Sequence, residues 1–259
     1  MIVGSALVRK KSKCTSFKPT RSIIKILTDI KREIIKMGIE VVRPNSTYFP
    51  FCRSLWVRDS FVNIDNKIIA LPLSSKNRGN NEWRSIPAKV STVFTGYPEK
   101  LEGGDIIQDG NLILVGEGQR TNNTGIKKLK SLFPKKKITV IKHTTLHLDC
   151  CLCILPNDLL LYSTRYIQSF PSFLKKKYKC VKVEDVIGSK IDPNLATNIL
   201  VIGHTLITTN QLKFKKLHKY LEDNGFDVKK IEYGNLWRQN GGIRCLTNWL
   251  EVPPKTKIT

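Results

Sequence analysis

The stretch IIQDGNLILVGEGQRTNNTGIKKLKSLFPKKKITVI, residues 106–141, decides the fold class. Its two short apolar runs, 106–108 and 112–115, predict strands. The segment 124–133 carries apolar residues three and four apart and stops before Pro134, which predicts a helix and its end. The run 138–141 predicts a third strand. The order strand, strand, helix, strand therefore indicates an α/β fold.

The same order recurs along the chain. At about fifty residues per unit, the 259 residues hold five units, although no repeat is visible in the residues themselves. We therefore expect one domain spanning residues 1–259 with a repeated α/β architecture, in place of a doubly wound sheet. The other predicted strands are 2–8, 40–43, 61–63, 68–73, 146–155, 159–162, 198–202 and 205–208, and the other predicted helices are 23–37, 169–178 and 211–224.

Composition predicts a globular, intracellular protein. Hydrophobic residues make up 41% of the chain, which is enough for a sizeable core. No apolar run approaches the length of a membrane span, and the first residues lack the charge order of a signal peptide. Seven cysteines without regular spacing fit a reducing compartment. We therefore expect a cytoplasmic protein with no membrane partner.

The formal net charge is +23, and lysines cluster at 127–128, 135–137, 175–177 and 215–216. Such a charge raises the possibility of nucleic-acid binding. The clusters are scattered, however, and lack the interleaved aromatic residues that would stack on bases. We interpret them as solvated faces and do not expect a nucleic-acid partner. No strand is followed by a glycine-rich nucleotide-binding turn, so we expect no cofactor.

A candidate nucleophile lies in Gly241-Gly242-Ile243-Arg244-Cys245-Leu246-Thr247. The thiol of Cys245 follows a glycine pair and stands beside a cation, a setting that buried structural cysteines rarely have. A cysteine nucleophile needs an imidazole and carboxylates as partners.

The run Leu146-His147-Leu148-Asp149-Cys150-Cys151-Leu152-Cys153 supplies an imidazole and a carboxylate. Read as a strand, it places His147 and Asp149 on one face. They are either an acid/base pair facing a pocket or a polar pair at a strand edge. A metal site that also uses His143 is an alternative, but alternation points Cys150 away from Cys151. We expect no metal and interpret these cysteines as core residues.

Two further runs place carboxylates within apolar sequence. Leu101-Glu102-Gly103-Gly104-Asp105 and Trp56-Val57-Arg58-Asp59 both border residues that should be buried. A buried carboxylate needs a cationic or donor partner, although a plain turn or an internal Arg58 pair remains the alternative. Arg78 and Arg120 offer cations that could hold a substrate carboxylate.

In order and spacing, these four runs and a fifth, residues 116–122 with Arg120-Thr121-Asn122, resemble the guanidino-group-modifying enzymes, which comprise arginine deiminase, dimethylargininase and the amidinotransferases. The resemblance implies a pseudo-fivefold α/β propeller of ββαβ units (pentein-like) with a central active site. It implies these roles: Cys245 as nucleophile, His147 as general acid/base, Glu102 as the orienting carboxylate, Asp59 and Asp149 as guanidinium clamps, Arg78 and Arg120 as α-carboxylate ligands, and Trp56 as a substrate-binding aromatic residue.

The resemblance predicts cysteine-dependent hydrolysis of a guanidinium C–N bond in arginine or a close derivative, through a covalent amidino-thioether. Asp149, two residues after the histidine, favours an unsubstituted guanidinium, and the run Glu102-Gly103-Gly104 favours hydrolysis over transfer. The alternatives are an amidinotransferase, a dimethylarginine dimethylaminohydrolase, which the chain length favours, and an inactive member that binds nucleic acid. The expected partner is a small guanidino substrate, and the sequence makes no prediction of oligomeric state.

Overall fold

The computed structural model describes residues 1–3, 21–44, 55–71, 73, 82–94 and 98–251. Arg78 and most of the predicted strand 2–8 lie outside these residues. Four three-stranded sheets share one connection pattern: the first two strands pair antiparallel, and the third pairs parallel with the second. A fifth sheet pairs β1 (Ile2–Val3) with β14 (Thr247–Asn248).

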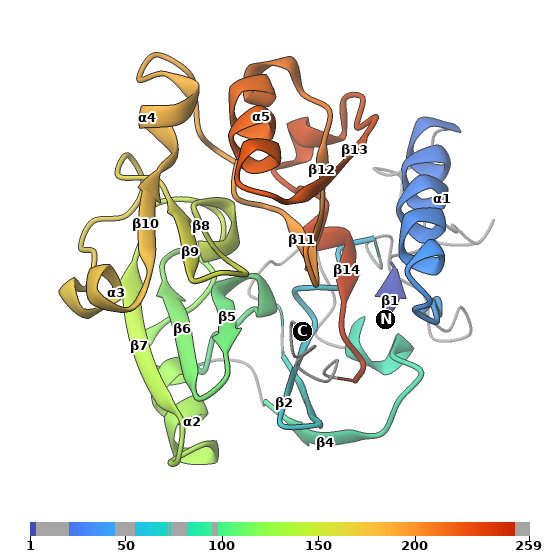
Figure 1. The fold of residues 1–259 in the computed structure, drawn as a ribbon. Helices are drawn as coiled ribbons and strands as arrows, with labels where there is room; N and C mark the ends of the chain where they lie inside the picture. The colour runs from blue at the N-terminus through green and yellow to red at the C-terminus, as the bar shows by residue number, and fades with distance from the viewer. Residues whose placement is uncertain (4–20, 45–54, 72, 74–81, 95–97, 252–259) are drawn as a thin grey trace.

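The four sheets follow one another along the chain. They consist of β2 (Phe61–Ile64), β3 (Lys67–Ala70) and β4 (Val90–Val93); β5 (Ile106–Asp109), β6 (Leu112–Glu117) and β7 (Lys137–Lys142); β8 (Leu152–Leu155), β9 (Leu159–Tyr162) and β10 (Lys179–Lys182); and β11 (Leu200–Ile202), β12 (Thr205–Thr209) and β13 (Asp227–Ile231). Figure 1 shows the sheets arranged around the middle of the molecule. The first strand of each three-stranded sheet (β2, β5, β8 and β11) and β14 are called the inner strands below.

Helical segments connect the second and third strand of each of these sheets. They are a 3₁₀ turn (Glu82–Ser85), α2 (Asn123–Leu132), α3 (Ser172–Lys177) and α5 (Lys215–Asp223), which follows a 3₁₀ turn at Leu212–Phe214. The order strand, strand, helix, strand is therefore confirmed in the three sheets that follow β4. A further short helix, α4 (Val183–Ile187), follows β10.

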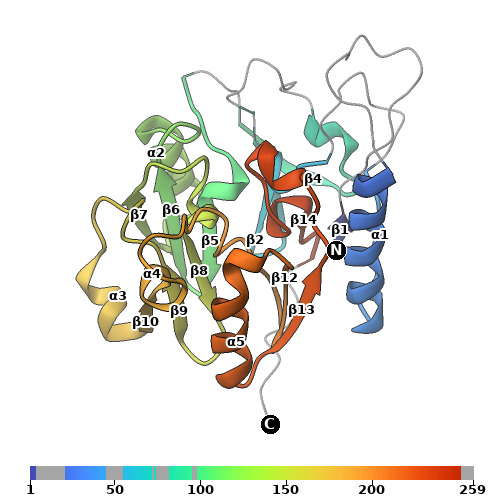
Figure 2. The same ribbon diagram turned by 90° about the horizontal axis from the view of Figure 1, so that it is seen from above.

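The longest helix, α1 (Arg21–Lys36), lies at one edge of the molecule in Figures 1 and 2. Its residues Ile23, Ile26, Leu27, Ile30 and Ile34 form a buried stripe at the three- and four-residue spacing of a helix face. The stripe belongs to the same apolar cluster as Leu246 and Cys245, so this helix shields one side of the region that contains Cys245.

The third strands of three sheets, β4, β10 and β13, were not predicted. Each is partly exposed, and β10 and β13 carry two lysines apiece, so their sequences resemble a solvated surface. Edge strands often carry such charges because these prevent pairing with another chain. The predicted strand 40–43 is absent. The predicted strand 146–155 is shorter than expected: residues Leu148–Cys150 form a 3₁₀ turn, and β8 begins at Leu152.

Candidate active site

Polar side chains precede each of the inner strands. The chain places them one to five residues before the strand begins, so different sheets contribute to one cluster. The residues are Asp59 before β2, Glu102 and Asp105 before β5, His147 and Asp149 before β8, Asn198 before β11, and Cys245 before β14, and all of them are less than 5% exposed.

His147 is held by two carboxylates. Its Nε2 lies 2.7 Å from Glu102 Oε2, and its Nδ1 lies 3.7 Å from Asp59 Oδ1. Burial alone would lower the pKa of His147, but the charge of Asp59 and the hydrogen bond to Glu102 outweigh burial, so the pKa stands well above its usual value. The ring is therefore a protonated imidazolium near neutral pH and can give a proton to a departing group.

The glycine pair after Glu102 allows this close packing. A Cβ on Gly103 would lie 2.1 Å from the carbonyl oxygen of Arg58, and one on Gly104 would lie 2.6 Å from Cγ of His147. In addition, the Gly103 amide donates to the Asp59 carbonyl oxygen at 3.1 Å. Side chains at these positions would push the Glu102, Asp59 and His147 segments apart.

Asp105 links the segments that carry Glu102 and His147. Its Oδ1 accepts from the Leu148 amide at 2.8 Å and lies 3.0 Å from His143 Nε2, and its Oδ2 accepts from the Thr121 hydroxyl at 2.6 Å. Thr121 Oγ1 also accepts from the Glu102 amide at 3.2 Å. His143, considered above as a metal ligand, is therefore a hydrogen-bonding partner of Asp105. Sequence reasoning missed this network, because buried threonine and histidine have no distinctive pattern.

Cys245 is 3% exposed and is positioned by Asn198. The Asn198 amide group donates to Cys245 Sγ at 3.1 Å, and its Oδ1 accepts from the amides of Arg244 and Cys245 at 2.9 and 3.3 Å. A Cβ on Gly242 would lie 2.4 Å from that Oδ1, so glycine is required for this contact. Asn198 was not predicted. The one signal available was its place at the start of the predicted strand 198–202; in the structure it lies two residues before β11 begins.

The Cys245 thiol also contacts the thiol of Cys150. The pKa of Cys150 is raised well above its usual value; the largest cause is this hydrogen bond, and the second is burial. Burial raises the pKa of Cys153 to about 12 as well, so both thiols stay protonated at neutral pH. Cys150 and Cys153 lie among the buried core residues, in agreement with the expectation that they pack there.

Asp149 and His147 bond to different partners, in contrast to the pair that the predicted strand geometry implies. The 3₁₀ turn at Leu148–Cys150 breaks the alternation, because successive side chains in a turn do not share one face. The Asp149 carboxylate is fully buried and accepts from Arg244 Nη1 at 2.6 Å, while Nη2 of the same guanidinium donates to the Ile106 carbonyl oxygen at 3.0 Å. The structure therefore pairs Asp149 with an internal guanidinium.

The remaining predicted residues surround this cluster. Arg120 Nη1 lies 3.7 Å from Glu102 Oε1, and the Arg120 side chain is 25% exposed. Trp56 is 7% exposed, and a Cβ on Gly241 would lie 2.2 Å from its ring, so the first glycine of the pair before Cys245 makes room for this ring. Arg78 lies outside the described residues.

Asp59, Glu102 and His147 bring ligand atoms within 4.8 Å of one another, a spacing that could hold a metal ion. His147 Nε2 and Glu102 Oε2 already share a hydrogen bond of 2.7 Å, which a metal would have to replace. The imidazole and carboxylates therefore suit proton transfer and the binding of an organic cation.

A family model for arginine deiminase matches residues 54–173. An uncharacterised protein of Bacillus subtilis, YkgA, is 29% identical over 150 residues, which is 57% of this chain and 51% of the relative, so the match spans about half the relative's length. An N(G),N(G)-dimethylarginine dimethylaminohydrolase of Streptomyces coelicolor is 26% identical over 204 residues, 75% of this chain and 73% of the relative.

Solved structures with the same fold include SxtG, an amidinotransferase from Microseira wollei, with a TM-score of 0.74, 18% identity, and coverage of 99% of this chain and 95% of that chain. The dimethylarginine dimethylaminohydrolase of Pseudomonas aeruginosa, in complex with citrulline, has a TM-score of 0.68, 20% identity and 91% coverage of both chains. Together, these matches support membership of the guanidino-group-modifying enzyme superfamily. Within the superfamily, the matching family model is that of arginine deiminase.

Proposed function

We propose that this chain is a cysteine-dependent hydrolase of a guanidinium C–N bond, acting on arginine or a close derivative. One observation carries the proposal: the buried His147 imidazole bonded to Glu102 and facing Asp59. A guanidinium is a planar cation that reacts poorly with nucleophiles unless it is held and stripped of water. Buried carboxylates can hold it through charge-assisted hydrogen bonds.

In the proposed reaction, the Cys245 thiolate attacks the guanidinium carbon and forms a tetrahedral adduct. The C–N bond then breaks, and His147 gives its proton to the departing amine, which leaves an amidino-thioether on Cys245. Neutral His147 next takes a proton from water, and the hydroxide attacks the same carbon. The C–S bond then breaks to return the thiolate, and the hydroxyl proton passes to solvent as the neutral ureido product is released. Glu102 keeps His147 oriented through both steps.

The substrate ligands we propose are Asp59 and Asp149 for the guanidinium, Arg120 and Arg78 for a carboxylate, and Trp56 beside them. Asp59 is supported by its place against His147, and Arg120 by its place beside Glu102. Asp149 already holds the guanidinium of Arg244, so the carboxylate is suited to a group of this chemistry.

We also propose that residues 1–259 form one catalytic domain in which β14, β1 and α1 complete a fifth unit of a pseudo-fivefold propeller. The four matching sheets support this arrangement. A reducing, cytoplasmic setting is supported by five free cysteines among the described residues. Separately, no helix within the described part of the chain is long and apolar enough to cross a membrane.

Incubation of the purified protein with arginine, N(G),N(G)-dimethylarginine and agmatine tests the activity. We expect a ureido product together with ammonia or dimethylamine, and after rapid quenching a covalent adduct on the peptide that contains Cys245. The His147→Asn variant should accumulate the adduct or fail to form it. Failure to turn over any guanidine, with no adduct, would reject the proposal.

Amidino transfer is the second candidate, because SxtG, the structural neighbour described as an amidinotransferase, aligns with nearly the whole chain. The same covalent intermediate would then react with an amine in place of water. Added glycine or lysine should in that case divert the amidino group to the amine, and water alone should give little product. That result would agree with the similarity to the superfamily and would reject the hydrolase proposal.

A further inference from the structure

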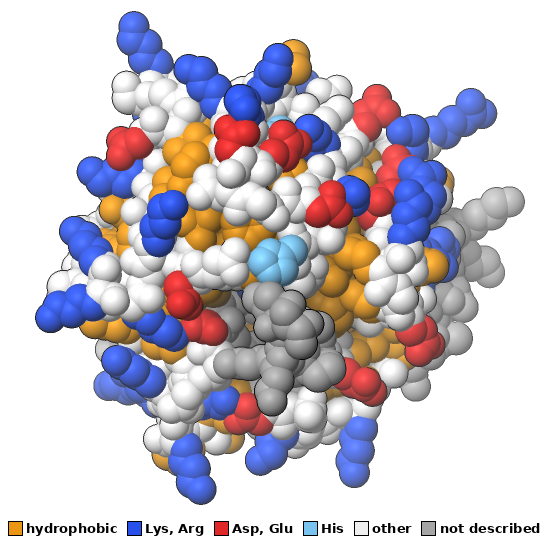
Figure 3. Space-filling view, in the orientation of Figure 1, with side chains coloured by type: hydrophobic (Ala, Val, Ile, Leu, Met, Phe, Trp, Pro, Cys, Tyr) orange, Lys and Arg blue, Asp and Glu red, His pale blue; other side chains and the backbone are white. Residues whose placement is uncertain are grey.

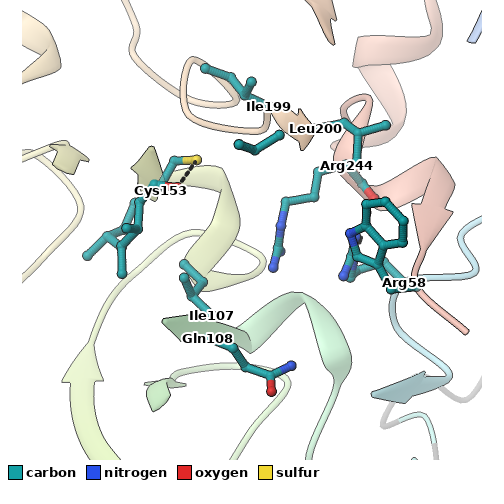
Figure 4. A pocket seen from close by; sticks show the side chains of 11 residues that line it. Arg58, Ile107, Gln108, Cys153, Ile199, Leu200 and Arg244 are labelled. Atoms are coloured by element: carbon teal, nitrogen blue, oxygen red, sulfur yellow. Dashed lines mark hydrogen bonds between the residues drawn. The ribbon is translucent and has the colours of Figure 1, made fainter. Parts of the chain in front are cut away.

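A pocket of about 240 Å³ lies beside the inner strands, and its walls are mostly apolar side chains of β5, β8 and β11. Its polar lining comes from Arg58, Arg244 and Gln108, with Trp249 at one side. Figure 4 shows the guanidinium groups of Arg58 and Arg244 near each other, with Gln108 and Ile107 opposite them. None of the lining residues is acidic.

This pocket is distinct from the candidate active site. The lining residues of β5, β8 and β11 lie within the strands or directly beside them, whereas Glu102, His147 and Asn198 precede those strands. Asp59, Glu102, His147 and Cys245 do not line the pocket. The inner strands therefore present carboxylates before their first residues and a cationic pocket along their length.

Arg58 is a buried cation whose bonds go to neutral groups. It is 8% exposed, its Nη1 donates to Asn248 Oδ1 at 3.0 Å, and its Nε donates to the Arg244 carbonyl oxygen at 3.4 Å. Among the described residues, no carboxylate lies within 4.0 Å of its guanidinium nitrogens. Burial and the nearby charge of Arg244 lower the pKa of Arg58 to about 9, and the more distant charges of Asp149 and Asp59 offset this only in part.

Arg244 supplies the second cation. Although Nη1 pairs with Asp149 and Nη2 donates to the Ile106 carbonyl oxygen, its guanidinium still lines the pocket, and its side chain is 15% exposed. Two guanidiniums that meet at a mostly apolar pocket repel each other, and one shared anion would relieve this repulsion. A cationic ligand would meet the same two charges and is disfavoured.

We propose that this pocket binds a small oxyanion, with Arg58 and Arg244 as its ligands and the Gln108 amide at its side. Guanidinium groups present N–H donors in a fixed fork that matches the oxygens of carboxylates, phosphate and sulfate. The volume admits a phosphate, a sulfate or a short dicarboxylate. This site does not depend on the proposed catalytic activity, because binding is measured without a guanidine substrate.

Calorimetric titration of the whole protein with inorganic phosphate, sulfate and succinate, at constant ionic strength set by chloride, tests the proposal. We expect saturable binding of at least one of these anions at one site per chain, and the preferred anion distinguishes a tetrahedral ligand from a carboxylate. The bound anion should also raise the melting temperature. Absence of saturable binding by all three would overturn the proposal.

A matched pair of substitutions separates the pocket from the lysine-rich surface. Gln108→Glu places a carboxylate at the pocket and should weaken binding about tenfold or more, because like charges at this distance repel strongly. Gln168→Glu makes the same change at an exposed position outside the pocket lining and should leave binding unchanged. Equal effects of both substitutions would assign the binding to the general positive charge and reject the site.

Arg58→Met removes one proposed ligand and should abolish binding. If this variant folds, as judged by circular dichroism, and binds as the original protein does, the proposal is wrong. If it does not fold, the Gln108→Glu and Gln168→Glu pair alone decides the question.

Discussion

The segments that precede the inner strands and the strands themselves differ in charge. The preceding segments gather Asp59, Glu102, Asp105 and Asp149, whereas the pocket beside the strands is lined by two guanidiniums and no acid. Arg244 joins the two regions, since it follows the glycine pair Gly241-Gly242, bonds to Asp149 and lines the pocket. Although the net charge of the chain is +23, its interior therefore contains an acidic cluster that is suited to a cation.

The surface of the protein does not show this difference in charge between the two regions. On the face seen in Figure 3, lysine and arginine side chains are spread widely, with acidic side chains between them. The carboxylates of the cluster and the two guanidiniums of the pocket are largely buried, and the low dielectric there strengthens their interactions. The following substitutions test the roles of residues in these two regions.

Cys245→Ser has the largest expected effect. A hydroxyl at this position is a much weaker nucleophile, so kcat with the best guanidine substrate should fall about 10⁴-fold or more. Steady-state assay of the ureido product measures the loss. Cys180→Ser alters another described free thiol, on β10, and should retain activity. Turnover by Cys245→Ser within tenfold of the original protein would contradict the assigned nucleophile.

Glu102→Gln comes next. Removal of the charge and of the 2.7 Å ion pair should lower the pKa of His147 and reduce kcat by about 10² to 10⁴-fold. An NMR titration of the histidine ring and the pH profile of kcat check the two effects. Glu117→Gln changes a carboxylate on β6 that is paired with Lys142 at 3.9 Å, and it should alter neither. An unchanged His147 pKa in Glu102→Gln would remove Glu102 from the proposed mechanism.

Arg244→Met breaks the link between the two regions. It leaves the fully buried Asp149 carboxylate without its 2.6 Å partner, so the free energy of unfolding should fall by about 3–5 kcal/mol. Urea denaturation measures the loss. The double variant Arg244→Met with Asp149→Asn should recover part of it, because the amide is neutral. A double variant no more stable than the single one would show that the ion pair is not the cause.

Asn198→Ala tests how far the thiol depends on its position. It removes the three contacts to the 244–245 segment, and a displaced nucleophile should lower kcat by roughly 10²-fold with little change in KM. The Asn194→Ala variant alters an asparagine on the same loop for which the structure shows no contact with Cys245 and should keep its activity. A rise in KM at constant kcat would instead indicate a role in substrate binding.

The smallest effect concerns pH and His147. Because its pKa is raised in the folded protein, His147 contributes stability that is fully present below its unfolded pKa of about 6.5. That contribution is lost as pH rises through the raised value. The difference in free energy of unfolding between the original protein and His147→Asn should therefore shrink as pH rises. A difference that is constant with pH would show that folding does not raise the pKa of the ring.

Much of the site could be predicted because its residues stand in short, distinctive runs, such as 101–105 and 241–247. The outer strands β4, β10 and β13 escaped prediction because their exposed or lysine-bearing residues resemble surface loops. Asn198 escaped because it stood at the start of the predicted strand 198–202, where one asparagine carries no pattern. The geometry of His147 and Asp149 was predicted wrongly, since a 3₁₀ turn replaced the expected strand.

The sequence by itself determined the kinds of group available and the order of the elements, because apolar spacing and glycine pairs are local properties of the chain. Only the tertiary structure decided which partners meet. It placed Glu102 against His147, Asn198 against Cys245, and Arg244 between Asp149 and a second buried guanidinium. These contacts join residues 45 to 186 positions apart, so they depend on how the sheets pack around the middle of the molecule, which no local pattern encodes.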